Sequence, residues 1–263
     1  MIPRTPPSPG HSTAMTITHE DELDGLKIIG RIVANTMHAM AKAMKPGMTT
    51  RELDDIGRAF LDQAGAISAP EATYDFPGAT CISVNEEIAH GIPGSRVLAE
   101  GDLVNIDVSA SKNGFYADTG ASFQLGRVFP EIDHLCRDGK RAMQIGIAEV
   151  SHGKPLANIG NAIGRFASAR GYTLIRNLAS HGVGRALHEY PEEIATWPSR
   201  DTRRIHAGLV LTVEPFLSRG GRWADTHAGD DWTLYAKPKA AVVQYEHTIV
   251  ATERGSIIVT LPG

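Results

Sequence analysis

Four acidic residues and one histidine lie in apolar or glycine-flanked segments, where packing does not explain a charged or ligating side chain. They are Asp107, Asp118, His181, Glu214 and Glu246. A carboxylate moved into a sheet interior loses several kcal/mol of hydration, so it persists there only beside a cation or a dense set of hydrogen-bond donors. Their own segments hold no cluster of Lys or Arg. The pattern therefore predicts a β-rich fold that encloses a pair of divalent ions.

The two aspartates belong to a predicted β-hairpin. Polar and apolar residues alternate on both sides of Asn113-Gly114, a pair typical of a two-residue turn. With that turn, Asp107 faces Gly120, and Asp118 lies two residues along the same face. Diagonal neighbours are about 7–8 Å apart, so both carboxylates can reach ions held about 3.5–4 Å apart.

The other three residues strengthen the metal-site prediction. Glu214 ends an apolar run just before Pro215, which cannot continue a central strand. Glu246 lies inside the β-branched stretch 242–250, where we expect a mid-strand position. His181 is followed by glycines, which allow close backbone approach. Oxygen ligands with one imidazole suit Mn, Fe, Co or Zn.

Composition narrows the class of protein. A chain of 263 residues with net charge −4 can bury a core as one domain and offers no basic surface for nucleic acid. Its only cysteines, Cys81 and Cys136, are too few for a disulfide scaffold. No apolar run approaches the ~18 residues of a membrane span, and the first twenty residues lack the core of a secretory signal. We expect a cytoplasmic enzyme that does not bind membranes.

The hydrophobic period predicts two helix pairs, each followed by strands. The helices are expected at about 18–44, 49–65, 130–151 and 155–170, and the later strands near 173–181, 209–214 and 242–250. Thr18 to Asp21 is a predicted capping box at the first helix, and Thr49 to Glu52 is predicted to open the second. The recurring order predicts a pseudo-twofold arrangement.

The N-terminal segment is Pro-rich. We predict that residues 1–17 form a flexible leader and that 18–263 form a single domain. Met15 is an alternative start of the chain, because the patterned sequence begins only there. Residues 1–14 are then expected to be dispensable.

From about Thr18 onward the chain resembles the type I methionine aminopeptidases. The matching motifs are residues 81–93 (CISVNEEIAHGIP), 104–108 (VNIDV), 114–119 (GFYADT), 181–189 (HGVGRALHE), 212–215 (TVEP) and 244–249 (QYEHTI). The resemblance implies an α+β pita-bread fold, a pseudo-twofold antiparallel sheet with helices on its outer face. The short interval between His188 and Glu214 lacks the insertion of type II enzymes.

The resemblance also implies roles for the site residues. Asp107 and Glu246 would bind one ion, Asp118 and Glu246 would bridge both, and His181 and Glu214 would complete the second. Glu214 would also shuttle a proton.

His188 would stabilise the oxyanion and His90 would hold the scissile amide, so both would bind substrate. The methionine pocket would be formed by residues including Phe76, Cys81, His90, Trp232 and Tyr74. Three positions depart from the common pattern and affect the expected specificity: Leu187 replaces Phe, Ser180 replaces Gly, and Thr73 stands where an aromatic residue is common.

The function implied is removal of the initiator methionine when the second residue is small, by attack of a water activated by two divalent ions (Co, Mn, Fe or Zn) on the first peptide bond. The partners would be N-termini of nascent polypeptides near the ribosome, and the enzyme would act as a monomer.

Three alternatives remain open from the sequence. An Xaa-Pro aminopeptidase or prolidase would share the ligands but resembles larger proteins with an additional N-terminal domain. A non-catalytic pita-bread binding protein would not need all five ligands. A phosphate-ester hydrolase would want basic residues beside the metals, and the ligand segments show none.

Overall fold

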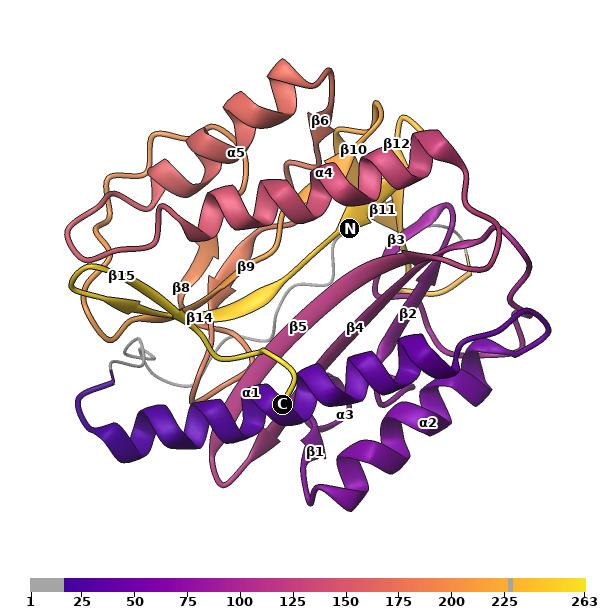
Figure 1. Ribbon diagram of the computed structural model, residues 1–263, viewed down its shortest axis with the longest axis horizontal. Helices are drawn as coiled ribbons and strands as arrows, with labels where there is room; N and C mark the ends of the chain where they lie inside the picture. Colours follow the sequence, from indigo (N-terminus) through magenta and orange to yellow (C-terminus); the bar gives the residue numbers. More distant parts are fainter. Residues whose placement is uncertain (1–16, 227–228) are drawn as a thin grey trace.

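Each half of the chain contributes a helix pair and the strands on which that pair packs (Figure 1). The structure is a computed structural model that describes residues 17–226 and 229–263. Its helices are α1 (Glu20–Ala43), α2 (Thr50–Gln63), α3 (Ala69–Tyr74), α4 (Pro130–Ile147) and α5 (Ala157–Ala169). Four of them confirm the predicted pairs, and α3 is an addition to the predicted repeat.

The helix starts show how local sequence sets the boundaries. The predicted start of α2 is confirmed, and it forms a capping box: the Thr49 hydroxyl accepts from the Glu52 N–H, and the Glu52 carboxylate accepts from the Thr49 N–H. At α1 the predicted box is wrong by one residue. Glu22, not Asp21, accepts the backbone N–H groups of Thr18 and His19.

The first half of the sheet is built around the predicted hairpin. Its strands are β1 (Ile67–Ser68), β2 (Cys81–Val84), β4 (Leu103–Lys112) and β5 (Phe115–Gln124), with β4 paired to the other three. Asn113 and Gly114 form the turn with φ of 52° and 78°, the left-handed values that a two-residue hairpin turn requires. In the register Asp107 faces Gly120 and Ser109 faces Asp118, as predicted.

The second half contains a five-stranded and a three-stranded sheet. The first has the order β15 (Gly255–Ile258), β14 (His247–Thr252), β9 (Val210–Val213), β7 (Ser180–Gly182) and β8 (Glu189–Ile194). The second has the order β13 (Val242–Gln244), β10 (Phe216–Ser218) and β6 (Thr173–Leu174). A further small sheet, β11 (Trp223–Thr226), β12 (Leu234–Lys237) and β3 (Glu87–Ala89), pairs strands of the two halves.

Two predicted strands are divided in the structure. The stretch 173–181 forms β6 and β7, which belong to different sheets. The stretch 242–250 is interrupted between β13 and β14, so Glu246 stands at a strand break and the predicted mid-strand position is wrong. Local β propensity alone does not show where a strand changes partners.

Each half has its own apolar core. In the first, side chains of α1 and α2 pack against β2, β4 and β5, with Ile29, Leu53 and Ile106 almost fully buried. In the second, α4 and α5 pack against β9, β10, β13 and β14, around Leu135 and Ile163. The helices thus cover the strands of their own half, and two smaller apolar clusters, one with Leu26 and Val210 and one with Ile88 and Phe216, join the halves.

That junction runs along β5 and the segment between β13 and β14, which lie side by side (Figure 1). The Glu246 N–H donates to the Gly120 carbonyl, and the Thr119 hydroxyl donates to the Glu246 carbonyl. An isolated bridge joins Ala121 to Tyr245. These bonds bring the ligands of the second half against the hairpin of the first.

The N-terminal predictions lie largely outside the described residues. Residues 1–16, including Met15, are not among them, and the leader and the alternative start stay predictions. Ile17, the last residue of the predicted leader, donates its backbone N–H to the Gly208 carbonyl and packs beside Leu26 and Val210. Within the described part of the chain, no helix is both long and apolar enough to cross a membrane.

A substitution in α1 tests how tightly the C-terminal segment packs. A Cβ at Gly30 would lie 2.2 Å from the Val259 carbonyl oxygen and 2.6 Å from its carbon. Alanine favours a helix over glycine by up to about 1 kcal/mol, yet backbone atoms cannot rotate away. We expect Gly30→Ala to lower the free energy of unfolding by about 1–3 kcal/mol in urea unfolding. Lys27→Ala, on the exposed face, should change it by less than about 0.5 kcal/mol, and equal effects would contradict the packing described.

Candidate metal centre and its substrate-facing histidines

The structure brings the five predicted ligands together from both halves of the chain. Asp107 lies in β4, Asp118 in β5 and His181 in β7, while Glu214 directly follows β9 and Glu246 follows β13. Ligand atoms of Asp118, His181 and Glu246 all lie within 4.8 Å of one another. The His181 Nε2 is 3.5 Å from Glu214 Oε1 and 3.9 Å from Asp118 Oδ2.

The hairpin register explains why the two aspartates meet. Asp107 and Asp118 occupy the same face of neighbouring strands, and their carboxyl groups lie within hydrogen-bonding reach of each other. Gly120, opposite Asp107, has no side chain, and its space is taken by the Gln244 amide, which a Cβ would approach to 2.3 Å.

His181 is held in the tautomer that a metal ligand needs. Its Nδ1 lies 2.9 Å from the Gly182 carbonyl oxygen, which can only accept, so Nδ1 carries the proton and Nε2 keeps a free lone pair. Burial lowers the pKa of His181 to about 4. The ring is therefore neutral at pH 7, and its free nitrogen faces Glu214 and Asp118.

Buried hydroxyl groups fix the backbone and the side chain of Glu214. The Thr212 hydroxyl accepts the His181 N–H at 3.1 Å and donates to Glu214 Oε1 at 2.7 Å. The Ser180 hydroxyl accepts the Glu214 N–H at 2.9 Å. Ser180 is fully buried, so its departure from glycine adds a hydrogen bond to the backbone of a ligand.

Two further contacts orient the other carboxylates. Asn105 donates to Gln244 Oε1, and Gln244 donates to Glu246 Oε2 at 2.9 Å. The Thr248 hydroxyl accepts the Asp118 N–H and donates to the Asp118 carbonyl. Such partners fix the direction of metal ligands. The Asn105–Gln244 and Thr248–Asp118 contacts join the two halves of the chain, and the Gln244–Glu246 contact spans the strand break.

The electrostatics of the cluster are unfavourable without a cation. Burial, followed by mutual repulsion, raises the pKa of Asp107, Glu214 and Glu246 well above ordinary values. Burial raises the pKa of Asp118 to about 6. None of the four forms an ion pair with a described Lys or Arg.

Two buried carboxylate oxygens of this cluster, Asp118 Oδ1 and Glu246 Oε1, have no hydrogen-bond partner among the described residues. Buried polar atoms are almost always satisfied, and carboxylate oxygens without donors are what a hard cation binds. The donor set thus fits a divalent metal ion.

The remaining predicted catalytic residues line the open side of the cluster. His188 directly precedes β8 and its ring centroid lies 4.0 Å from that of His181. His90 follows β3 with φ of 53° and lies close enough to His188 to lower the pKa of that ring. Both residues keep part of their surface open to solvent although their rings are partly desolvated, whereas His181 is buried. A substrate can therefore reach them.

The predicted pocket residues occupy two loops and one strand. Phe76 and Trp232 make an edge-to-face contact with centroids 5.3 Å apart. Phe76 is buried and follows α3, Trp232 precedes β12, and Cys81 faces Asp107 in the β2–β4 register. The two aromatic residues meet each other from opposite halves of the chain.

Of the three positions that depart from the common pattern, Ser180 contacts a predicted ligand, because its hydroxyl accepts the Glu214 N–H. Leu187 is almost fully buried beside His188, and Thr73 is exposed at the end of α3.

Sequence reasoning missed the hydroxyl of Thr212 and the contact of Tyr74 with His188. Thr212 had a usable signal, because it is the one polar residue in the apolar run before Glu214 and shares its face. The Tyr74 contact had none, since it depends on how α3 packs.

The comparison with known proteins agrees with this geometry. Residues 24–253, which include all five predicted ligands, match metallopeptidase family M24. Methionine aminopeptidase 2 of Bacillus subtilis is 47% identical over 248 residues, 94% of this chain and 99% of that protein. The Escherichia coli methionine aminopeptidase is 35% identical, with 94% of each covered. The chain belongs to the methionine aminopeptidases of metallopeptidase family M24.

Solved structures agree on the fold. A methionine aminopeptidase from Rickettsia prowazekii superposes with a TM-score of 0.89 at 33% identity, covering 94% of this chain and all of that one. A prolidase from Pyrococcus furiosus has a TM-score of 0.75 at 20% identity, and only 66% of it is covered. The prolidase shares the pita-bread fold, and the predicted fold is confirmed. The family and the cluster together make the protein a metal-dependent aminopeptidase.

We expect Thr212→Val to weaken metal binding by about 10- to 100-fold, because it removes a bond that orients Glu214. It should also destabilise the protein by about 1–3 kcal/mol, since the His181 N–H loses its acceptor. Isothermal titration with Mn²⁺ and urea unfolding measure the two effects.

Thr196→Val is the matched control, because Thr196 is fully buried and its hydroxyl has no hydrogen-bond partner among the described residues. That variant should bind metal normally. Equal metal affinities of the two variants would contradict the role of Thr212.

The raised pKa of Asp118 predicts a pH dependence of stability. Its folded pKa of about 6 exceeds the ordinary 3.8, so protonation stabilises the metal-free folded state, and this stabilisation is lost as pH rises through about 6. Relative to Asp118→Asn, the wild type in EDTA should lose stability between about pH 4 and 6, and the difference should then level off. The comparison cancels the histidines that titrate in the same range. A difference independent of pH would show that Asp118 has an ordinary pKa.

Proposed function

We propose that this enzyme removes the N-terminal methionine of proteins and peptides whose second residue is small. The observation that carries the proposal is the buried group of four carboxylates and His181, with two unpartnered oxygens, beside two exposed histidines. The names of its relatives favour methionine as the residue removed.

We further propose that the cluster holds two divalent ions, of Co, Mn, Fe or Zn. Asp107, Asp118 and Glu246 would hold the first ion, and Asp118, His181, Glu214 and Glu246 would hold the second. Four carboxylates balance the charge of two such ions, and a single ion leaves two negative charges uncompensated. Bound ions would supply an acidified water at neutral pH and polarise the scissile carbonyl.

The chain's own residues then handle protons and charge. Glu214 has one oxygen bonded to Thr212, which leaves the other oxygen to carry a proton from water to the leaving amine. His188, on the open side, donates a hydrogen bond to the carbonyl oxygen as negative charge develops. His90 holds the scissile amide.

The pocket for the methionine side chain is assigned to Phe76, Cys81 and Trp232, with His90 at its edge. Burial and the nearby carboxylates Asp107 and Asp118 raise the pKa of the Cys81 thiol, so it remains protonated and apolar. An edge-to-face aromatic pair beside a neutral thiol suits a flexible thioether.

The cellular setting follows from the same proposal. The substrates are N-termini of newly made chains, and the enzyme acts on them near the ribosome, as a cytoplasmic monomer of type I. An Xaa-Pro aminopeptidase or prolidase activity is not favoured, because the prolidase match supports the fold alone.

A peptide assay tests the function. The Mn²⁺-loaded protein should release methionine from Met-Gly-X and leave Leu-Gly-X and Ala-Pro-X intact. His188→Ala should keep the metal stoichiometry and lower kcat by about 100-fold or more, the effect of losing one oxyanion donor. Asp118→Ala should lose both activity and metal.

Preferential cleavage of Ala-Pro-X would replace the proposal with the proline-directed alternative. Loss of metal in His188→Ala would make that histidine a ligand and exclude the role proposed for it.

A further inference from the structure

A tyrosine on the short helix α3 touches the histidine proposed to stabilise the oxyanion. The Tyr74 hydroxyl lies 2.6 Å from His188 Nδ1, and the ring centroids are 5.6 Å apart at an interplanar angle of 54°. The distance is that of a strong hydrogen bond. It joins α3, from the first half of the chain, to the loop before β8 in the second.

The direction of this bond decides which nitrogen of His188 holds the proton. A neutral imidazole has one N–H and one bare nitrogen, so Nδ1 can either accept the phenol O–H or donate to the phenol oxygen. Burial, and then the negative charge of Asp118, raise the pKa of Tyr74 above its usual 10, so the phenol keeps its proton at neutral pH and can donate it. Only that direction leaves an N–H on Nε2, which the role proposed for His188 requires.

We propose that Tyr74 is a positioning residue that holds His188 in the tautomer with its proton on Nε2. The two nitrogens of an imidazole point to different sides of the ring, so occupation of Nδ1 by Tyr74 leaves Nε2–H as the donor for the substrate carbonyl. This rests on the function proposed above for His188. Without Tyr74 the neutral ring can place its proton on Nδ1, and Nε2 then has no hydrogen to donate.

The neighbouring His181 supports the proposal, because a local contact at its Nδ1 also fixes its tautomer. At His181 the Gly182 carbonyl holds the proton on Nδ1 and frees Nε2 as a ligand. At His188, only 4.0 Å away between ring centroids, a donor occupies the same nitrogen instead. The two rings thus carry their protons on opposite nitrogens, one for binding a cation and one for donating to an oxygen.

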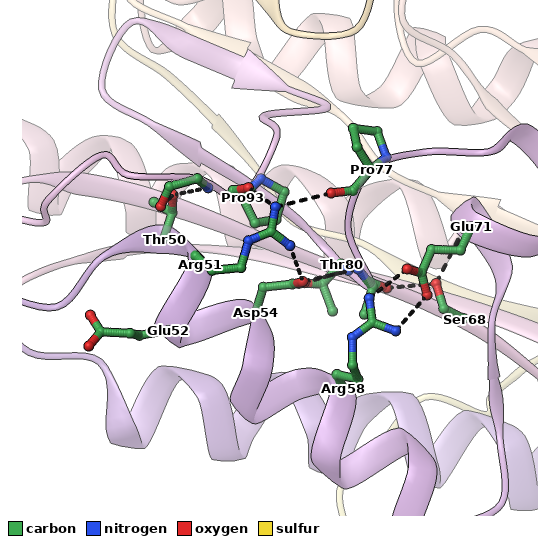
Figure 2. Close-up of polar contacts among 12 residues, drawn as sticks. Thr50, Arg51, Glu52, Asp54, Arg58, Ser68, Glu71, Pro77, Thr80 and Pro93 are labelled. Carbon is green, nitrogen blue, oxygen red and sulfur yellow. Dashed lines mark hydrogen bonds and ion pairs between the residues drawn. The ribbon is translucent and has the colours of Figure 1, made fainter.

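Tyr74 can do this only if α3 is fixed, and Figure 2 shows how α2 holds it. Arg58 of α2 makes two hydrogen bonds, of 3.0 and 2.5 Å, to the carboxylate of Glu71 in α3. The Ser68 hydroxyl accepts the Glu71 N–H at 3.5 Å and donates to the Ala79 carbonyl. Two bonds to one carboxylate set its orientation as well as its distance.

The loop after α3 is anchored to the same helix (Figure 2). The fully buried Asp54 carboxylate accepts from the Ala79 and Thr80 N–H groups and from the Thr80 hydroxyl. Arg51 donates to the Pro77 carbonyl of this loop at 3.4 Å. The segment that carries Tyr74 is therefore fastened to α2 on both sides.

The decisive experiment compares Tyr74→Phe with the wild type, both loaded with Zn²⁺ and labelled with ¹⁵N-histidine. Ring nitrogens with and without a proton have well-separated ¹⁵N shifts, and His188→Asn assigns the His188 signals. We expect the wild-type ring to be protonated on Nε2 and bare on Nδ1, and the variant to show a mixture of tautomers. On Met-Gly-X, kcat should fall about 10- to 100-fold with little change in KM, the range for losing an orienting partner.

Two controls separate this role from general stability. Tyr172→Phe removes a hydroxyl bonded to Asp138 and located away from the site, between α5 and β6, and it should leave the tautomer and kcat unchanged. Arg58→Met should lower kcat by loosening α3, but should have no further effect on kcat in the Tyr74→Phe background, because both act through the same bond.

A proton on Nδ1 of His188 in the wild type would overturn the proposal, as would an unchanged tautomer and kcat in Tyr74→Phe. Additive effects of the two variants would also contradict it. The NMR result does not depend on cleavage, so a protein with the expected tautomer but no activity on Met-Gly-X would instead disprove the proposed function.

Discussion

The candidate site is governed by the repulsion among four carboxylates, of which Asp118 and Glu246 are buried and Asp107 and Glu214 are half-buried. Burial and then repulsion raise the pKa of Asp107, Glu214 and Glu246, burial raises the pKa of Asp118, and none of the four has a described Lys or Arg as ion-pair partner. Such a group is stable only around cations or when protonated. The surrounding residues do not neutralise it, and they instead fix where each oxygen points. The metal-free folded state is destabilised by this repulsion, and metal binding would stabilise it.

The orienting bonds are concentrated at the junction of the two halves. The two largest apolar cores each lie under their own helix pair, and smaller apolar clusters join the halves, one of them around Leu26 and Val210. Hydroxyl and amide groups add directional contacts across the junction, among them Thr119, Thr248 and the Asn105–Gln244 pair. Hydrogen bonds are directional, and a metal site requires ligand atoms held at defined positions and orientations.

Much of the site was predictable because its signals are local. The Asn113-Gly114 turn fixes the register that pairs Asp107 with Gly120, and each predicted carboxylate ligand stands out as a charge in a strand-like segment. The repeated helix pairs were equally readable from hydrophobic periodicity. The strand break at Glu246 and the division of 173–181 were not, because a change of partner depends on distant strands. The bond between Tyr74 and His188 depends on the packing of α3, and no sequence pattern predicts that packing.

The order of the ligands along the chain has a consequence for biosynthesis. They extend from Asp107 to Glu246, and the hairpin aspartates meet the last glutamate only through the strand break beside Gly120. A partly synthesised chain that ends before Glu246 lacks one carboxylate of the cluster and the backbone bonds that join the second half to β5. Under the proposed assignment of Glu246 as a metal ligand, such a chain has no peptidase activity while it is still emerging. Catalytic competence would then arrive late in translation, once Glu246 has been added.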